Sequence, residues 1–330
     1  KNYHLTSVYT ATPVTTGFLS ENYVLQTERE KYFLKQYRYV KPQTVAAVHA
    51  AKFFFAQANV PVILPYRNKK HDTFFAFENK YYSLFPFVEG RHLQRGCFST
   101  QALHTTAEML AKIHRTGQHA NPFPVQKSQS KLDYERFVTS AQQILNIISR
   151  QERTAFDELA AECVYLKLHL AEQQRAAFTA IDLVSDHLIH GDYQEGNLFF
   201  DKNEQVSHVF DWEKSSLAPR GLELVRAIEF ICFSNPNDYK AVFSEENYGK
   251  ARQFLQSYHQ AYPILLSEFF VASQLRYLQK ILSLWVETEH YLENSKRVDV
   301  FLEAEYNTIK YYSHSLQKHI ECISGGITHV

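Results

Sequence analysis

The sequence predicts an α+β fold with two lobes. Residues 1–88 are expected to form a small antiparallel sheet with one main helix, and residues 89–330 a larger, mostly helical lobe. Up to residue 88, apolar residues occur mostly in short strand-like runs, and after residue 90 they recur at helical spacing. In addition, a chain of 330 residues is longer than one compact core usually holds.

Four strands and one helix are expected in the smaller lobe. The strands pair as two hairpins, with turns at residues 28–30 and 78–80, because polar turn residues separate β-prone runs there. Between the hairpins, Pro42 begins a helix over residues 43–58 that is rich in Ala and Phe, and Asn59 ends it. The predicted strands are residues 23–27, 31–37, 74–78 and 81–88.

Helical periodicity dominates the larger lobe. Ser99 is a suitable N-cap for a helix that runs to Ile113, and Gly221 begins a helical region that continues almost to the last residue. The other predicted elements are helices over residues 132–148 and 153–180 and short strands over residues 198–200 and 206–210.

The composition is that of an ordinary folded protein, with 45% hydrophobic and 21% charged residues. Lys and Arg together number 35, as do Asp and Glu, so the formal net charge is zero, which argues against nucleic-acid binding. No apolar run approaches the ~18–20 residues of a membrane-spanning helix, and no signal-peptide core opens the chain. The four cysteines form no CxxC pair. We therefore expect a cytoplasmic protein with reduced thiols, without membrane insertion, present as a monomer or homodimer.

One loop carries most of the functional signal. Asp192 and Asn197 stand five positions apart after His190, in the order of the kinase catalytic loop H-R-D-x-x-x-x-N, and Gly191 takes the place of its Arg. Asp192 is the candidate catalytic base, which would accept the proton of a substrate hydroxyl and orient its oxygen for in-line attack. A lone Asp in such a loop is more often a turn or cap residue. For His190 we expect a structural role, with hydrogen bonds that brace the loop.

A metal site is predicted beside this loop. Asn197 precedes the strand over residues 198–200 and Asp211 ends the strand over residues 206–210, so a hairpin brings their oxygens to the same edge. Mg²⁺ in kinase sites is held by one or two such side chains together with phosphates. Asn197 and Asp211 are therefore the candidate Mg²⁺ ligands, and three spacings in agreement favour this function over a simple turn.

Candidate nucleotide contacts lie in the smaller lobe. Lys35 stands within the second strand, where its ammonium would act on triphosphate oxygens as a point charge; Lys31 points to the same face and competes for this role. The turn that contains Ser20 could cover phosphates through backbone N–H groups and the Ser20 hydroxyl. Phe87 and Val88 join the two lobes, where adenine could pair with backbone groups. An ordinary edge strand explains that segment equally well.

The order of these residues resembles that of a known family of small-molecule kinases with a bilobal protein-kinase-like fold. The motifs that are similar to the aminoglycoside phosphotransferase and choline kinase-like family are Lys35, His190-Gly-Asp192, Asn197 and Asp211-Trp-Glu213. They look closest to the branch of spore-coat kinases and homoserine or amino-alcohol kinases. The resemblance implies ATP and Mg²⁺ as cofactors, Asp192 as catalytic base, Asn197 and Asp211 as metal ligands, and Lys35 as the lysine that binds ATP phosphates.

Two positions depart from the family's pattern. The family usually has a Glu on the helix of the smaller lobe that pairs with the strand lysine, whereas residues 43–58 contain no acidic residue and His49 stands near that position. Lys35 is therefore expected to be held by an acid of the larger lobe or, less strongly, by His49. After Asp211, Glu223 takes the place of the acidic residue that often opens the next helix.

The acceptor contacts are the least specified part of the site. Residues 276–290 are expected to lie on one helix, with Tyr277, Trp285 and Glu289 on a broad side that could bind an ammonium group by cation–π and ionic contacts. Such an aromatic stripe is more often core. Trp285 and Glu213 are weak candidates for substrate contacts.

The leading hypothesis is an ATP- and Mg²⁺-dependent kinase that phosphorylates a hydroxyl of a small, amine-bearing acceptor, such as an amino alcohol, amino sugar or aminoglycoside. The alternative is a pseudokinase, a nucleotide-binding scaffold without turnover, which the missing helix Glu motivates. A protein kinase is less favoured, because no Ala-Pro-Glu anchor follows Asp211 at the expected spacing. The sequence leaves open the acceptor and the choice between ATP and GTP.

Overall fold

The computed structural model describes residues 2–3, 5, 8–14, 22–37, 41–118, 120, 132–180, 185–233, 242–325 and 327. The chain forms two compact units. Unit 1 comprises Lys1–Leu93, Met109–Lys127 and His187–Leu217, and unit 2 comprises Gln94–Glu108, Ser128–Asp186 and Ala218–Val330. The segment around Asp192, which the sequence places in the larger lobe, thus belongs to unit 1 together with the amino-terminal sheet. The division into lobes at residue 88 stays a prediction.

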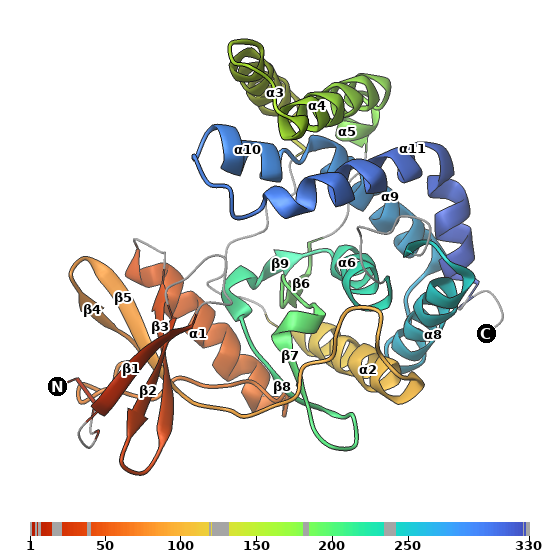
Figure 1. Cartoon of the computed structure of the whole chain (residues 1–330). Helices are drawn as coiled ribbons and strands as arrows, with labels where there is room; N and C mark the ends of the chain where they lie inside the picture. Colours follow the sequence, from red (N-terminus) through yellow and green to blue (C-terminus); the bar gives the residue numbers. More distant parts are fainter. Residues whose placement is uncertain are drawn as a thin grey trace. The chain divides into compact units, whose positions relative to one another are not determined.

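Unit 1 is built on a five-stranded antiparallel sheet with strand order β1-β2-β3-β5-β4 (Figure 1). The strands are β1 Val8–Val14, β2 Asn22–Thr27, β3 Lys31–Tyr37, β4 Phe75–Phe77 and β5 Lys80–Pro86. Both predicted hairpins are confirmed. At the second hairpin turn, Glu78 and Asn79 both have positive φ, 47° and 60°, as a tight two-residue turn requires. Strand β1 is not among the predicted strands, because it is exposed along almost its whole length and lacks an apolar alternation.

Helix α1, Pro42–Gln57, covers one face of this sheet (Figure 1). It begins with Pro at its first turn, and Asn59 follows its end in the left-handed conformation, with φ 59°, as predicted for the residue that stops it. By strand alternation Lys35 and Tyr37 share a face of β3. The hydroxyl of Tyr37 lies 2.8 Å from Nε2 of His49 on α1, so this is the face that α1 covers.

Two short strand pairs complete unit 1 and hold the loop of interest. The strands are β6 His187–Ile189, which pairs with β9 Ser216–Ala218, and β7 Leu198–Phe200, which pairs antiparallel with β8 Val206–Val209. Single bridges, Val62 to Val209 and Arg91 to Phe200, fasten the β7–β8 pair to the chain on either side of β4 and β5 in sequence. The rings of Phe55 on α1 and Trp212 lie 4.7 Å apart. Unit 1 therefore joins the sheet, α1 and the motif loop in one packed body.

Unit 2 is helical, as the periodicity predicts (Figure 1). The described helices outside unit 1 are α3 Tyr134–Ser149, α4 Ala155–Gln173, α5 Ala177–Ala180, α6 Arg220–Cys232, α8 Glu245–Ala261, α9 Leu266–Leu282, α10 Trp285–Tyr291 and α11 Leu302–Ser324. Helix α2, Thr100–Gly117, contributes residues to both units, and Ser99 caps it as expected, its hydroxyl accepting a hydrogen bond of 3.1 Å from the Ala102 N–H.

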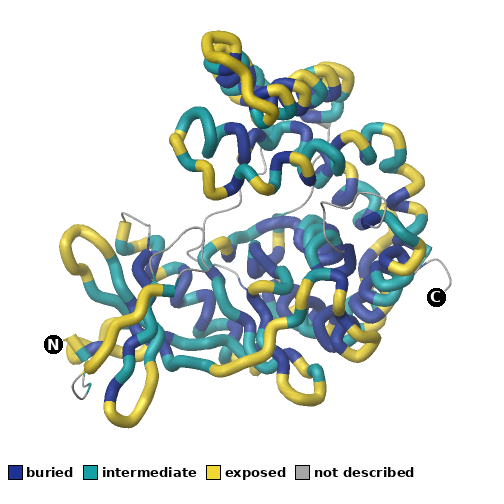
Figure 2. Tube along the Cα trace, in the orientation of Figure 1, coloured by how far each residue is buried: buried dark blue, intermediate teal, exposed yellow. Residues whose placement is uncertain are grey.

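Buried residues recur on one side of these helices (Figure 2). On α3 they are Phe137, Ala141, Ile144 and Ile148, spaced by four, three and four positions, and they join one core cluster with residues of α4, α9, α10 and α11. Among the described residues, no helix is long and apolar enough to cross a membrane.

Two predicted long helices are broken in the structure. Residues 153–180 divide into α4 and α5, and residues 276–290 divide between α9 and α10, with Ser283 and Leu284 outside both. The prediction that Tyr277, Trp285 and Glu289 share one helical side is therefore wrong. The ammonium of Lys167, on α4, donates to the Ser283 carbonyl at 2.7 Å, which satisfies a backbone group at the break. Tyr277 is buried in the core, whereas Trp285 is 44% exposed and stacks on Phe301.

Candidate active site

The loop between β6 and β7 is held by His190. Its Nδ1 accepts a hydrogen bond of 3.1 Å from the backbone N–H of Asp192, so this nitrogen carries no proton. The proton then sits on Nε2, which lies 2.9 Å from the Phe210 carbonyl and donates to it. A neutral imidazole thus ties the backbone of this loop to the residue after β8, which is the bracing role expected from the sequence.

Gly191 explains why this loop has no Arg at that position. Its φ is +84°, a conformation that favours glycine, and a Cβ at this position would lie 2.0 Å from the carbonyl oxygen of Lys214. The loop and the segment after Asp211 therefore approach each other more closely than any residue with a side chain would allow.

Asn197 and Asp211 come from neighbouring strand ends, as the hairpin argument predicts. Asn197 lies just before β7, and its backbone carbonyl accepts a 3.1 Å hydrogen bond from the Phe210 N–H, next to Asp211. The amide nitrogen of Asn197 donates to the Asp192 carbonyl at 2.8 Å, a bond that does not use the amide oxygen. Asp211 has φ 61° and ψ 56°, a left-handed conformation that Asp tolerates better than most residues and that ends β8 abruptly.

Lys35 lies between two carboxylates. Its Nζ donates to Asp211 Oδ1 at 2.9 Å and contacts Glu213 Oε1, and its side chain is 11% exposed. Burial lowers the pKa of Lys35, but the two carboxylates outweigh burial and raise the pKa above its ordinary value. Burial likewise raises the pKa of Asp211, yet the ammonium of Lys35 brings it below its ordinary value. Both groups are therefore charged at neutral pH.

These contacts decide between the partners considered for Lys35. The acids that follow β8 hold it, and His49 does not, because His49 bonds instead to Tyr37 and to the Thr73 hydroxyl, at 2.8 and 2.7 Å. The contact with Lys35 also favours, for Glu213, a role in holding the lysine over the predicted role in acceptor binding. Lys31, the competing lysine, lies at the start of β3, 3.8 Å from Glu89 and over the Phe87 ring.

Two lysines of this cluster were not identified from the sequence. Lys214 Nζ donates to Asp192 Oδ2 at 3.1 Å, and about half of its side chain is exposed. Lys52, on α1, is 5% exposed and lies over the Phe85 ring at 4.3 Å from its centroid. Lys52 carries one detectable signal in the sequence, since it stands three residues after His49 and so on the same side of the helix.

The remaining predicted site residues are placed as follows. Phe87 and Val88 follow β5 directly and are partly buried. Ser20 lies outside the described residues. Glu223 lies in the first turn of α6 and is buried, and Trp285 belongs to unit 2.

The donor set suits a cation that is shared with phosphates. Within the residues that the structure describes, no group of three or more His, Cys, Asp and Glu side chains is arranged to hold a metal ion alone. Asn197 and Asp211 provide oxygen atoms, the ligands that Mg²⁺ prefers, and Mg²⁺ in kinase sites takes its other ligands from phosphates and water. The residues present therefore fit a Mg–nucleotide complex better than a metal held by protein side chains alone.

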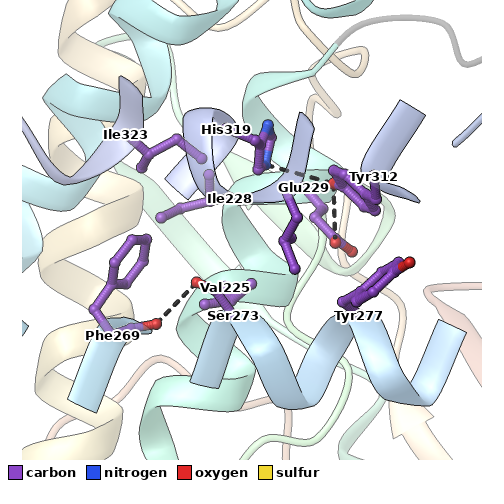
Figure 3. A pocket seen from close by; sticks show the side chains of 10 residues that line it. Val225, Ile228, Glu229, Phe269, Ser273, Tyr277, Tyr312, His319 and Ile323 are labelled. Atoms are coloured by element: carbon purple, nitrogen blue, oxygen red, sulfur yellow. Dashed lines mark hydrogen bonds between the residues drawn. The ribbon is translucent and has the colours of Figure 1, made fainter. Parts of the chain in front are cut away.

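Unit 2 contains a small cavity between α6, α9 and α11 (Figure 3). Its polar lining includes Glu229, whose Oε1 accepts a hydrogen bond of 3.4 Å from the Tyr312 hydroxyl, and His319. The cavity has a volume of about 20 Å³, which is room for roughly one water molecule. It is too small to hold an amine-bearing acceptor.

The chain matches the model of the phosphotransferase enzyme family over residues 10–301. No curated protein matches it significantly. The solved structures that are similar over most of their length include three whose names identify them as kinases or phosphotransferases. An amicoumacin kinase in complex with AMP-PNP, Ca²⁺ and Ami has a TM-score of 0.64 and 11% identity, covering 96% of this chain and 90% of that chain. Spectinomycin phosphotransferase APH(9)-Ia in complex with ADP and spectinomycin has a TM-score of 0.63 and 16% identity, covering 98% and 95%.

A microcompartment-associated aminopropanol kinase has a TM-score of 0.63 and 13% identity, covering 96% of this chain and 95% of that chain. At such low identity these likenesses show the fold, which is the predicted α+β kinase-like fold with an antiparallel amino-terminal sheet and a mostly helical remainder.

Proposed function

Because this chain belongs to the phosphotransferase enzyme family, we propose that it is an ATP- and Mg²⁺-dependent kinase that phosphorylates a hydroxyl of a small, amine-bearing molecule. One observation carries the proposal. Lys35, which is far away in the sequence, lies in unit 1 together with Asp192, Asn197 and Asp211, and hydrogen bonds of 2.8–3.1 Å link these residues through the loop.

Each residue has a role that its surroundings support. Asp192, on a loop whose backbone His190 fixes, would accept the acceptor's hydroxyl proton at its carboxylate and orient the oxygen. Lys35, kept protonated by two acids, would bind phosphate oxygens. Asn197 and Asp211 would hold Mg²⁺, which when bound neutralises charge on the β- and γ-phosphates.

The names of the similar structures support the proposed acceptor class. Their names refer to amicoumacin, spectinomycin and aminopropanol as the molecules bound or phosphorylated. We therefore place the acceptor among amino alcohols, amino sugars and aminoglycosides. Trp285 remains a candidate contact for its ammonium group, being 44% exposed.

The test is an assay of ADP release with Mg²⁺ and a panel of hydroxylated amines: choline, ethanolamine, aminopropanol, homoserine, thiamine and several aminoglycosides. We expect turnover with at least one of them, and a loss of about 10²- to 10⁴-fold in Asp192→Asn, which keeps the shape but not the basicity. In Asp211→Ala we expect loss of Mg²⁺-dependent turnover, and a wild-type rate in this variant would refute the metal assignment.

A nucleotide-binding scaffold is the second candidate, because α1 contains no acidic residue to take the place of the Glu that the resemblance implies. Calorimetry with ATP and Mg²⁺, run beside the panel, separates the two. Binding without turnover of any acceptor would favour the scaffold, whereas absence of nucleotide binding would exclude both.

A further inference from the structure

A buried lysine of α1 has no anionic partner among the described residues. Lys52 is 5% exposed, and within the part of the chain that the structure describes its ammonium forms no hydrogen bond or salt bridge. It contacts the face of the Phe85 ring, with its Nζ 4.3 Å from the centroid. A cation–π contact stabilises a cation less than desolvation of an ammonium costs, so the charge of Lys52 is poorly compensated.

Lys52 lies beside the charged residues of the candidate active site. It shares the buried side of α1 with His49 and Phe55, whose ring lies near that of Trp212, between Asp211 and Glu213 in the sequence. Burial first, and then the positive charge of Lys35, lower the pKa of Lys52 to about 7, while Glu213 and Asp211 act in the opposite direction. Lys52 is thus close enough to Lys35, Asp211 and Glu213 for their charges to change its pKa, although it forms no direct contact with them.

The two lysines nearest Asp211 and Glu213 differ in their contacts with these carboxylates. Lys35 contacts both carboxylates, Asp211 and Glu213, whereas Lys52 contacts neither. Phe85 and Lys35 lie on the same face of the sheet, because their partners in register, Phe33 and Ser83, alternate in phase with them. The second ammonium is therefore directed at the face of the sheet that carries Lys35, where an added anion would be stabilised by both lysines.

We propose that Lys52 is a second cation of the nucleotide site, which binds phosphate oxygens of the nucleoside di- or triphosphate alongside Lys35. This inference rests on the proposed function and names a residue that neither the sequence motifs nor the family resemblance assigns. A bound phosphate supplies the negative charge that compensates the Lys52 ammonium, which has no such partner among the described residues of the free protein. Nucleotide binding therefore stabilises the folded protein with Lys52 charged and buried. Lys52 is not needed to hold Lys35, because Asp211 and Glu213 already do so.

The experiment compares Lys52→Met, which keeps most of the apolar stem, with Lys70→Met, in which an exposed lysine of the same unit is changed in the same way. Affinities for ADP and for AMP-PNP are measured by isothermal titration calorimetry with and without Mg²⁺, so that binding is separated from turnover. Thermal midpoints are measured for each protein, free and saturated with nucleotide.

We expect Lys52→Met to bind both nucleotides about 10- to 100-fold more weakly, as the loss of a charged hydrogen bond predicts, and Lys70→Met to bind like wild type. The free Lys52→Met protein should melt at or above the wild-type temperature, because a poorly compensated buried charge has been removed. Saturating nucleotide should reverse that order, which a purely structural lysine would not do.

The outcomes distinguish this inference from the proposed function. If the wild type binds nucleotide and Lys52→Met binds equally well, the inference is wrong and the proposed function stands. If the wild type binds no nucleotide, both fail together. If Lys52→Met and a second variant, Lys52→Gln, both fail to fold, the inference is also refuted, because it requires the free protein to tolerate the loss of this charge.

Discussion

Gly191 offers the sharpest test of the geometry around Asp192. In Gly191→Ala the new methyl group would start 2.0 Å from the Lys214 carbonyl oxygen, and contacts under 3.0 Å essentially never occur, so the two segments must separate by about 1 Å. The φ of +84° adds a cost of about 1–2 kcal/mol for any residue with a Cβ, and forced overpacking adds about 1–3 kcal/mol. We expect the free energy of unfolding to fall by about 2–5 kcal/mol.

The same displacement should impair catalysis, because Lys214 bonds to Asp192 at 3.1 Å and moves with its own backbone. A misplacement of about 1 Å near a catalytic group can cost about 100-fold in rate. Urea unfolding followed by circular dichroism measures the first effect, and ADP release with the best acceptor measures the second.

Gly196→Ala is the matched control. Gly196 lies in the same loop and has no positive φ, and among the described residues no atom beyond its chain neighbours lies within 4 Å of an added methyl group. This substitution should leave both stability and rate close to wild type. A Gly191→Ala protein as stable and active as Gly196→Ala would refute the close approach of the two segments.

Two further predictions concern buried titratable groups. The pKa of His49 is lowered to about 3, first by burial and then by Lys52 and Lys35, so the folded protein keeps this ring neutral while the unfolded chain protonates it below about pH 6.5. Its contribution to the free energy of unfolding is therefore complete above about pH 6.5 and is lost at about 1.4 kcal/mol per pH unit as the pH falls toward 3. In His49→Gln, the urea midpoint should depend less on pH between about 6.5 and 4.5 than in the wild type. An unchanged slope would contradict this prediction. Lys167 and Glu287 form a salt bridge with both side chains 1% exposed, so Glu287→Gln should destabilise the protein by about 3–5 kcal/mol in chemical denaturation. The double variant Lys167→Met, Glu287→Leu should recover part of that loss, although the Ser283 carbonyl then loses its donor. If the single and double variants lost the same free energy of unfolding, the unpaired buried charge would not be the cause of the loss in Glu287→Gln.

The candidate catalytic loop could be predicted because its signal is local. Asp192, Asn197 and Asp211 lie within twenty positions, and the β7–β8 hairpin that brings them together is short enough to be read from the alternation of residues 198–210. Gly191 belongs to the same local pattern, although only the structure shows that the Lys214 carbonyl is the atom that excludes a side chain.

The partners of the charged residues could not be predicted in the same way. Lys35 and Asp211 are 176 positions apart, and the sequence left an acid and His49 as alternatives. His49 is engaged by Tyr37 and Thr73, which removes it from the choice. Lys214 looks like an ordinary surface lysine in the sequence, and the one local signal of Lys52, its place on the same side of the helix as His49, does not distinguish a buried ammonium from a solvated one.

The sequence alone determines the strand-rich first part and the helical remainder of the chain, the hairpins and α1. It also determines the group of residues suited to phosphoryl transfer, because periodicity, turns and short motif spacings are local properties. Contacts between distant segments set which carboxylates hold Lys35, that Lys52 is buried away from them, and that the helix over residues 276–290 breaks where Lys167 reaches the Ser283 carbonyl. Those outcomes depend on which side chains from remote parts of the chain come within about 3 Å of each other on folding, the range of a hydrogen bond. A pattern along the sequence does not indicate which remote side chains become neighbours.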